Sequence, residues 1–183
     1  MSVYIIKTEQ SGSTMEQGRA HARELHKKCC PPREIARYLR KSGLSIYEVA
    51  RVFHETLGFS PQGVARLLYE SLDQGLEIVA IALHTELGLT PEELVMVFRE
   101  PLREGPHMAT QVMLKYLHIP VTRVAQALHS RQGGEYEWHT LVRSLRYAGV
   151  PEKHVQEVVL RVCGDGLTKE CIEECPMKYS RWH

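Results

Sequence analysis

The sequence has no long apolar run, and none approaches the roughly 20 residues that a membrane-spanning helix requires. Its first residues, MSVYIIKTEQSGST, hold one short apolar patch with no cationic region before it, which does not fit a secretory signal. We therefore expect a protein that has no membrane partner and resides in the cytoplasm, where its thiols stay reduced.

The common motifs of catalytic and cofactor sites are also missing. The chain has no G-x-S-x-G, no HExxH, no acidic metal triad and no C-x2-C pair. Gly133 and Gly134 lie in a polar loop, but the GK[ST] that completes a phosphate-binding loop does not follow them. These absences predict that the protein is not an enzyme and has no catalytic residues.

Charge of one sign does not dominate the chain, whose net charge is only +1, but the charges are unevenly spread. Residues 19–41 hold eight Lys and Arg against two Glu, and residues 54–104 hold nine acids against three Arg. The first segment is therefore strongly basic and the second strongly acidic. Solvated helix faces explain such runs, and so does a basic end that meets nucleic acid or an acidic partner.

Apolar residues recur at a regular interval along the chain. From Val49 to Val124, an apolar residue opens a new group every 15 residues, and further apolar residues follow at offsets of +1, +3 and +4. Those offsets cover one face of an α-helix, whereas a strand would alternate with period two. The pattern predicts an all-α fold of about 10–11 short helices, arranged as hairpins of about 30 residues each.

Two nearly interchangeable stretches, HETLGFSP and HTELGLTP, show how the predicted helices are joined. Glycine at such a turn supplies the left-handed conformation that ends a helix, the hydroxyl residue after it caps the next helix, and proline fits the first helical position. We expect positive φ at Gly58 and Gly88, and caps from Ser60 and Thr90. Equivalent structural turns are predicted at Gly43 and Gly149.

Other turns depart from this form. His118 stands where glycine is expected, which predicts a turn built differently, and the turns at residues 73–75, 103–106 and 131–135 look looser and more polar. The whole arrangement predicts an extended or irregular lead at residues 1–14, one helical repeat domain at residues 15–163, and a short cysteine-containing helix with a tail at residues 164–183.

The alternation of GLS, GFS and GLTP turns with EVARVF, GVARLL and ELVMVF helices over residues 33–163 resembles bacterial short-helix repeat proteins of the α-solenoid kind. That resemblance implies a binding scaffold without naming a ligand, so we expect a protein-interaction adaptor or regulator. The VYII segment and the C-terminal tail are candidates to cover the ends of the array, within the chain or across a homodimer. Tyr179, Arg181 and Trp182 in that tail are candidate interface residues.

The segment SIYEVARVFHETLGFSPQGVARLLYES also resembles a helix-turn-helix, in which the second helix enters the major groove of DNA. Gly58, Val64 and Leu67 fit that motif, but His54 stands where a small residue is normal. An alternative function is therefore nucleic-acid binding, and a weaker one is an acidic middle that mimics nucleic acid. The candidate phosphate-contacting residues are Arg19, Arg23, Lys27, Lys28, Arg33, Arg37, Arg40 and Lys41.

Three of the five cysteines cluster near the end of the chain, at Cys163, Cys171 and Cys175. Because Cys171 and Cys175 stand at i and i+4, both thiols would share one helix face, and Cys163 or His183 could complete a tetrahedral structural zinc site. A redox pair of Cys171 with Cys175, or incidental reduced thiols, are the other interpretations. Otherwise no cofactor is expected.

Overall fold

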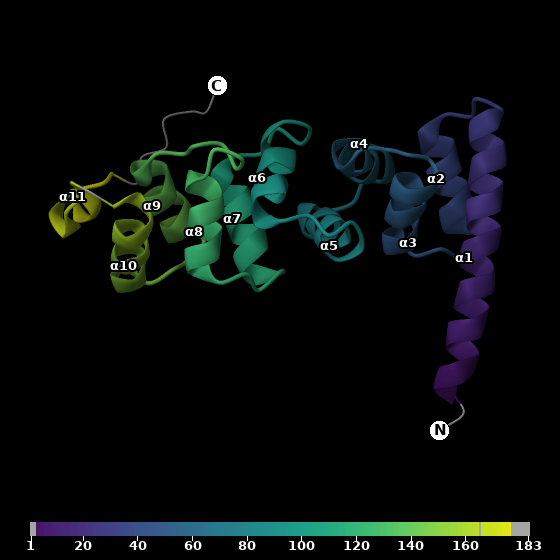
Figure 1. Cartoon of the computed structure of the whole chain (residues 1–183), viewed down its shortest axis with the longest axis horizontal. Coiled ribbons are helices and arrows are strands. Elements are labelled where there is room, and N and C mark those ends of the chain that lie inside the picture. Colours follow the sequence, from purple (N-terminus) through teal and green to yellow (C-terminus); the bar gives the residue numbers. More distant parts are fainter. Residues whose placement is uncertain (1–2, 165, 177–183) are drawn as a thin grey trace. The chain divides into compact units, whose positions relative to one another are not determined.

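The computed structural model describes the backbone of residues 3–164 and 166–176, and the side chains of residues 15–164 and 166–176. Within these residues every regular element is a helix and there is no strand, so the fold is all-α as predicted (Figure 1). Two compact units divide the chain, unit 1 (Met1–Gly88) and unit 2 (Leu89–His183). The single repeat domain at residues 15–163 stays a prediction, and the regular turn LGLTP runs across the boundary between the two units.

From residue 3 onward, unit 1 forms five α-helices, two of which continue into a π-helical turn near their C-terminal ends. Its elements are α1 (Val3–Lys27), α2 (Pro32–Lys41), α3 (Ile46–Arg51) with η1 (Val52–Thr56), α4 (Pro61–Arg66) with η2 (Leu67–Ser71), and α5 (Leu76–Glu86). The apolar residues that set the sequence period form the core. Val49, Phe53, Val64 and Leu68 are all fully buried, which is the main favourable term in folding.

Residues 3–14 of the predicted irregular lead are helical, because α1 begins at Val3 and runs without interruption to Lys27. Gly12 and the β-branched and hydroxyl residues around it disfavour helix by no more than about 1 kcal/mol each. Extending an existing helix costs far less than starting one. A helix nucleated in residues 15–27, where α1 packs on α2 and η1, can therefore extend toward the N-terminus through the earlier residues.

Unit 2 contains six helices among its described residues. They are α6 (Pro91–Arg99), α7 (Pro106–Lys115), α8 (Val121–His129), α9 (Trp138–Tyr147), α10 (Glu152–Cys163) and α11 (Lys169–Glu173). α7 packs on α9, and α8 packs on both α6 and α10, so the core forms between helices that are close in sequence. Phe98, Met113, Leu128 and Leu141 have no more than 1% of their surface exposed.

The predicted glycine turns are confirmed. Gly58 and Gly88 have φ of 73° and 71°, and Gly43 and Gly149 are also positive, at 94° and 83°. The hydroxyl of Ser60 accepts a hydrogen bond from the amide of Gly63 at 3.1 Å. Thr90 accepts one from the amide of Glu93 at 3.3 Å, and the Glu93 carboxylate accepts from the Thr90 amide at 2.8 Å, which completes a capping box.

The turn at His118 is not built differently, and the turn at residues 103–106 is not looser. His118 has φ of 52°, and the amide of Ile119 donates to Met113 O at 3.1 Å, just as Phe59 donates to Phe53 O at 3.0 Å. Arg103 likewise has φ of 56°. An L-residue can enter the left-handed region at a modest steric cost, so the shape of the turn decides the conformation even where glycine is absent.

This geometry predicts that His118→Gly will raise the free energy of unfolding of unit 2 by about 0.5–1 kcal/mol, because glycine relieves the left-handed strain but gains freedom in the unfolded chain. Urea denaturation measures the change. Gly149→Ala is the matched control. No neighbouring atom lies within 4 Å of a Cβ added there, so backbone strain alone should destabilise that variant by about 1 kcal/mol. A less stable His118→Gly protein would contradict this account of the turn.

Candidate functional site: a groove between α1 and α2

α2 has one buried face and one charged face. Its apolar residues Ile35, Ala36 and Leu39 are fully buried against the rest of unit 1. The opposite face exposes Glu34, Arg37, Tyr38 and Lys41. These positions follow the helical spacing i, i+3, i+4 and i+7, so they form one continuous stripe. The helix starts with Pro32 at its first position and ends before Gly43, so the stripe covers almost its whole length.

A glycine in α1 lets this helix lie close to the turn that follows α2. Gly18 is buried, and a Cβ added to it would meet the Leu44 side chain at 2.9 Å, which is too near for any other residue without a shift. One turn further on, the ring of His21 packs against Tyr38 with centroids 5.3 Å apart. Leu25 follows on the same face and is half-buried. Beyond this contact, an incompletely filled space lies between Leu25 of α1 and the residues of α2.

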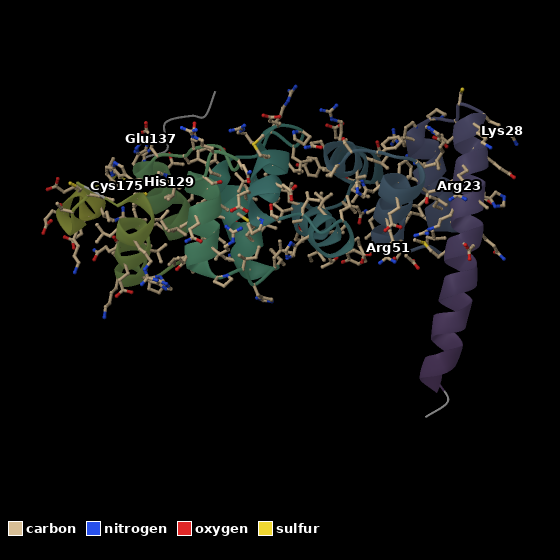
Figure 2. All side chains as sticks on the ribbon, in the orientation of Figure 1. Arg23, Lys28, Arg51, His129, Glu137 and Cys175 are labelled. Carbon is tan, nitrogen blue, oxygen red and sulfur yellow. The ribbon has the colours of Figure 1, made fainter. Side chains whose placement is uncertain are left out.

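That space is an open groove of about 340 Å³, which we call the α1–α2 groove. Its lining residues are Leu25, Cys30, Glu34, Ile35, Arg37, Tyr38 and Lys41. Leu25 and the Tyr38 ring provide its exposed apolar surface above the fully buried Ile35, and Tyr38 keeps 40% of its surface exposed. Arg37 and Lys41 stand on the α2 rim, and Lys28 lies at the C-terminal end of α1 (Figure 2).

The eight basic residues singled out in the sequence all lie on or beside α1 and α2, but the structure gives them different surroundings. Arg19 forms an ion pair with Glu55 at 2.5 Å, Arg40 donates to Leu44 O at 2.6 Å, and Arg37 approaches Glu34 at 3.5 Å. The other five are exposed: Arg23, Lys27, Lys28, Arg33 and Lys41. Arg19 and Arg40 therefore have roles within unit 1 itself.

Tyr38 and Leu25 are the site residues that the sequence analysis missed. Charge alone selected the neighbouring Arg37 and Lys41. A signal for Tyr38 does exist in the sequence, because an aromatic residue on the polar face of an amphipathic helix, beside Glu34 and Lys41, has no place in the core. No comparable signal marks Leu25, because its half-exposed position depends on how α1 packs against α2.

The helix-turn-helix resemblance is explained by local geometry. α4 together with η2 would be the DNA-reading helix, but Val64, Ala65, Leu67 and Leu68 on it are buried. Its exposed basic residue is Arg66, which approaches Glu70 at 3.9 Å. His54, which replaces the small residue of the motif, uses Nδ1 to form a hydrogen bond of 2.8 Å with Phe59 O and so fastens the turn.

The three C-terminal thiols do not converge as the zinc hypothesis requires. Within the described side chains, no three His, Cys, Asp or Glu residues form a group that could hold a metal ion, and His183 lies outside those residues. α11 ends at Glu173, so Cys175 lies beyond the helix and does not share a face with Cys171. Cys171 is exposed, whereas Cys175 is buried with Sγ 3.8 Å from His139 O. Burial raises the pKa of Cys163, which disfavours its thiolate.

Arg146 holds this C-terminal segment in place, a role that the sequence did not reveal. From α9, its guanidinium donates to Cys175 O at 2.8 Å and to Ile172 O at 2.9 Å, and it also binds both carboxylate oxygens of Glu152. Arg143 adds a hydrogen bond of 3.0 Å to Pro176 O. The segment around Cys175 (Figure 2) is therefore held by hydrogen bonds from these two arginines to its backbone carbonyl oxygens.

The pair with Arg146 predicts how stability depends on pH. The hydrogen bonds from Arg146 lower the pKa of Glu152, so this carboxylate stabilises the folded state above the pKa of an unperturbed glutamate, about 4.3. That contribution disappears as the pH falls from there through the lowered pKa. Glu152→Gln should therefore be less stable than the native protein at pH 7, and the difference should shrink below pH 4.

Urea denaturation at several pH values tests this expectation. Glu100→Gln provides the control, because Glu100 meets Arg99 in an ion pair whose two side chains are 61% and 39% exposed. Such a pair contributes little. Equal pH profiles for the two variants would contradict the role assigned to Glu152.

The remaining predicted positions lie outside what the structure describes, namely Tyr179, Arg181 and Trp182. In the described part of the chain, no helix is both long enough and apolar enough to cross a membrane. No family model, curated protein or solved structure matches this chain.

Proposed function

We propose that this chain is a non-enzymatic helical-repeat protein of the α-solenoid kind that acts as a protein-interaction adaptor or regulator, and that it binds through the α1–α2 groove. The exposed Tyr38 over an apolar floor, with cations on the rim, carries this proposal. Protein interfaces are typically built this way, with aromatic and apolar residues at the centre and a polar rim. Tyrosine and arginine are also common among the residues that contribute most to binding.

Nucleic-acid binding is the second candidate, supported by the five exposed cations on and beside α1 and α2. Phosphate contact needs Lys and Arg side chains that are not already bonded within the protein, because each one that neutralises a phosphate displaces a counterion from the nucleic acid. Arg19 and Arg40 are instead bonded within unit 1, which weakens this candidate. Mimicry of nucleic acid by the acidic middle has less support, because Glu55 and Glu86 are paired with Arg19 and Arg51.

Site-specific photo-crosslinking tests the proposal. A benzophenone amino acid replaces Tyr38 in the full chain, and extract from cells that encode the protein is irradiated with it. The matched control places the same group at Tyr116 in unit 2, which is also exposed, at 49%. We expect discrete adducts at position 38 that protease removes and nuclease does not, and none at position 116. Adducts removed by nuclease would favour the second candidate, and equal labelling at both positions would contradict a specific site.

A further inference from the structure

The shape of the α1–α2 groove matches one class of protein partner. The stripe from Glu34 to Lys41 spans about two helical turns, or roughly 10 Å. Leu25 of α1, which is half-buried, and the ring of Tyr38 form a short apolar strip, and the exposed side chains of Arg37 and Lys41 stand beside it. An amphipathic helix fits such a strip, because its apolar residues at i, i+3 or i+4, and i+7 lie along one line.

The charge around the groove indicates the sign of the charge on the partner. Residues 19–41 hold eight Lys and Arg against Glu24 and Glu34, and Arg37 and Lys41 of the groove lining are both exposed. Glu34 is the acidic group in the lining, and it faces Arg37 at 3.5 Å. Opposite charge across an interface speeds association and excludes partners of like charge. The complement of this rim is acidic.

We propose that the α1–α2 groove binds an acidic amphipathic helix of a partner protein. This inference rests on the proposed function and adds the chemistry of the partner. Apolar side chains of that helix lie on Leu25 and the ring of Tyr38. Its flanking carboxylates meet Lys41 and Arg37 on the α2 rim.

An apolar floor of this kind distinguishes a helical peptide from a nucleic acid. Phosphates would contact the exposed cations equally well on either side of α2, including Arg33, which lies outside the groove lining. A peptide helix instead requires Tyr38 and the rim cations together. The two classes of ligand therefore respond differently to replacement of Tyr38.

Fluorescence anisotropy with defined peptides tests the proposal on the full chain. The probe is a labelled peptide of about 16 residues, roughly four turns, with leucines on one face and glutamates on the others. One control peptide has the same composition with its apolar stripe scrambled, and another has lysine in place of each glutamate. The protein variants are Lys41→Glu and Tyr38→Ala, with Lys115→Glu on α7 as an exposed control for the change in charge.

We expect the acidic amphipathic peptide to bind at least about tenfold more tightly than either control peptide. Lys41→Glu should weaken it at least about fivefold, and Tyr38→Ala about tenfold, whereas Lys115→Glu should leave it unchanged. Higher salt should weaken binding to the native chain. Circular dichroism of each variant verifies that the helices are retained.

Several outcomes would overturn the proposal. They are equal binding of the scrambled peptide, no effect of Lys41→Glu, or tighter binding of a 20-base-pair duplex that Tyr38→Ala leaves unchanged. Self-association of the chain that Lys41→Glu abolishes would also overturn it, because a second copy would then be the occupant. If adducts still form at position 38 while the peptide fails, the proposed function stands and only the acidic helix is rejected. If both fail, the groove is not a binding site.

Discussion

Phe53→Ala is expected to lower the free energy of unfolding of unit 1 by about 3–5 kcal/mol, the range for removing a large aromatic side chain from a packed core. Phe53 is fully buried, and its ring meets that of Phe59 edge-on, with centroids 5.1 Å apart. Alanine loses this contact and leaves a cavity that the surrounding helices can only partly fill. Because the stability of a whole domain is typically 5–15 kcal/mol, this one change removes a large share.

Urea denaturation and hydrogen exchange of the amides in α3 and α4 measure the effect. Phe53→Leu is the matched control, since leucine keeps most of the volume and should cost less than about 1.5 kcal/mol. Equal losses for the two variants would indicate that the aromatic contact with Phe59, rather than filled volume, provides the stabilisation.

Arg146→Ala is expected to release the C-terminal segment. The substitution removes the donors to Ile172 O and Cys175 O, and it leaves Glu152 without its cation. Hydrogen bonds from charged groups contribute about 1.5–3 kcal/mol each. We expect the free energy of opening of α11 to fall by about 2–3 kcal/mol, which is a roughly 30- to 150-fold loss of exchange protection at residues 172–175.

Hydrogen exchange followed by mass spectrometry resolves this segment from the rest of unit 2. Arg146→Lys is the informative comparison, because lysine keeps the charge but cannot direct separate donors to two carbonyls and a carboxylate. It should recover only part of the protection. Arg143→Ala removes a single exposed hydrogen bond to Pro176 O and should have a smaller effect. Full protection in Arg146→Ala would show that burial of Ile172 is sufficient to hold α11.

Features that depend on residues close in sequence were predictable. The φ of Gly58 and the cap from Ser60 follow from a motif of a few residues. The burial of Val49 and Phe53 follows from helical spacing. His118 shows where this reasoning ends, because it adopts the conformation expected of glycine. The turn is closed by a backbone hydrogen bond between Ile119 and Met113, and that bond imposes the conformation whatever the side chain.

Features that depend on distant residues were not predictable. Arg146 lies 26 residues before Ile172, and no local pattern links them. The basic residues could be identified as a group from charge alone. However, the ion pair of Arg19 with Glu55 depends on the packing of α1 against η1. The partial exposure of Leu25 and Tyr38 depends on the packing of α1 against α2. The boundary between the two units has no linker composition that would mark it.

The turns also have a kinetic consequence. Each is closed by hydrogen bonds between backbone groups five or six residues apart, such as Leu44 to Leu39 and Phe59 to Phe53. The helices that follow are started by their own caps, at Ser45 and Thr90 for example. Proteins built from such local contacts fold fast, because little loop entropy is lost before contacts form. Unit 1 is therefore expected to fold fast once its helices have left the ribosome together, because a single short hairpin cannot bury its apolar face alone.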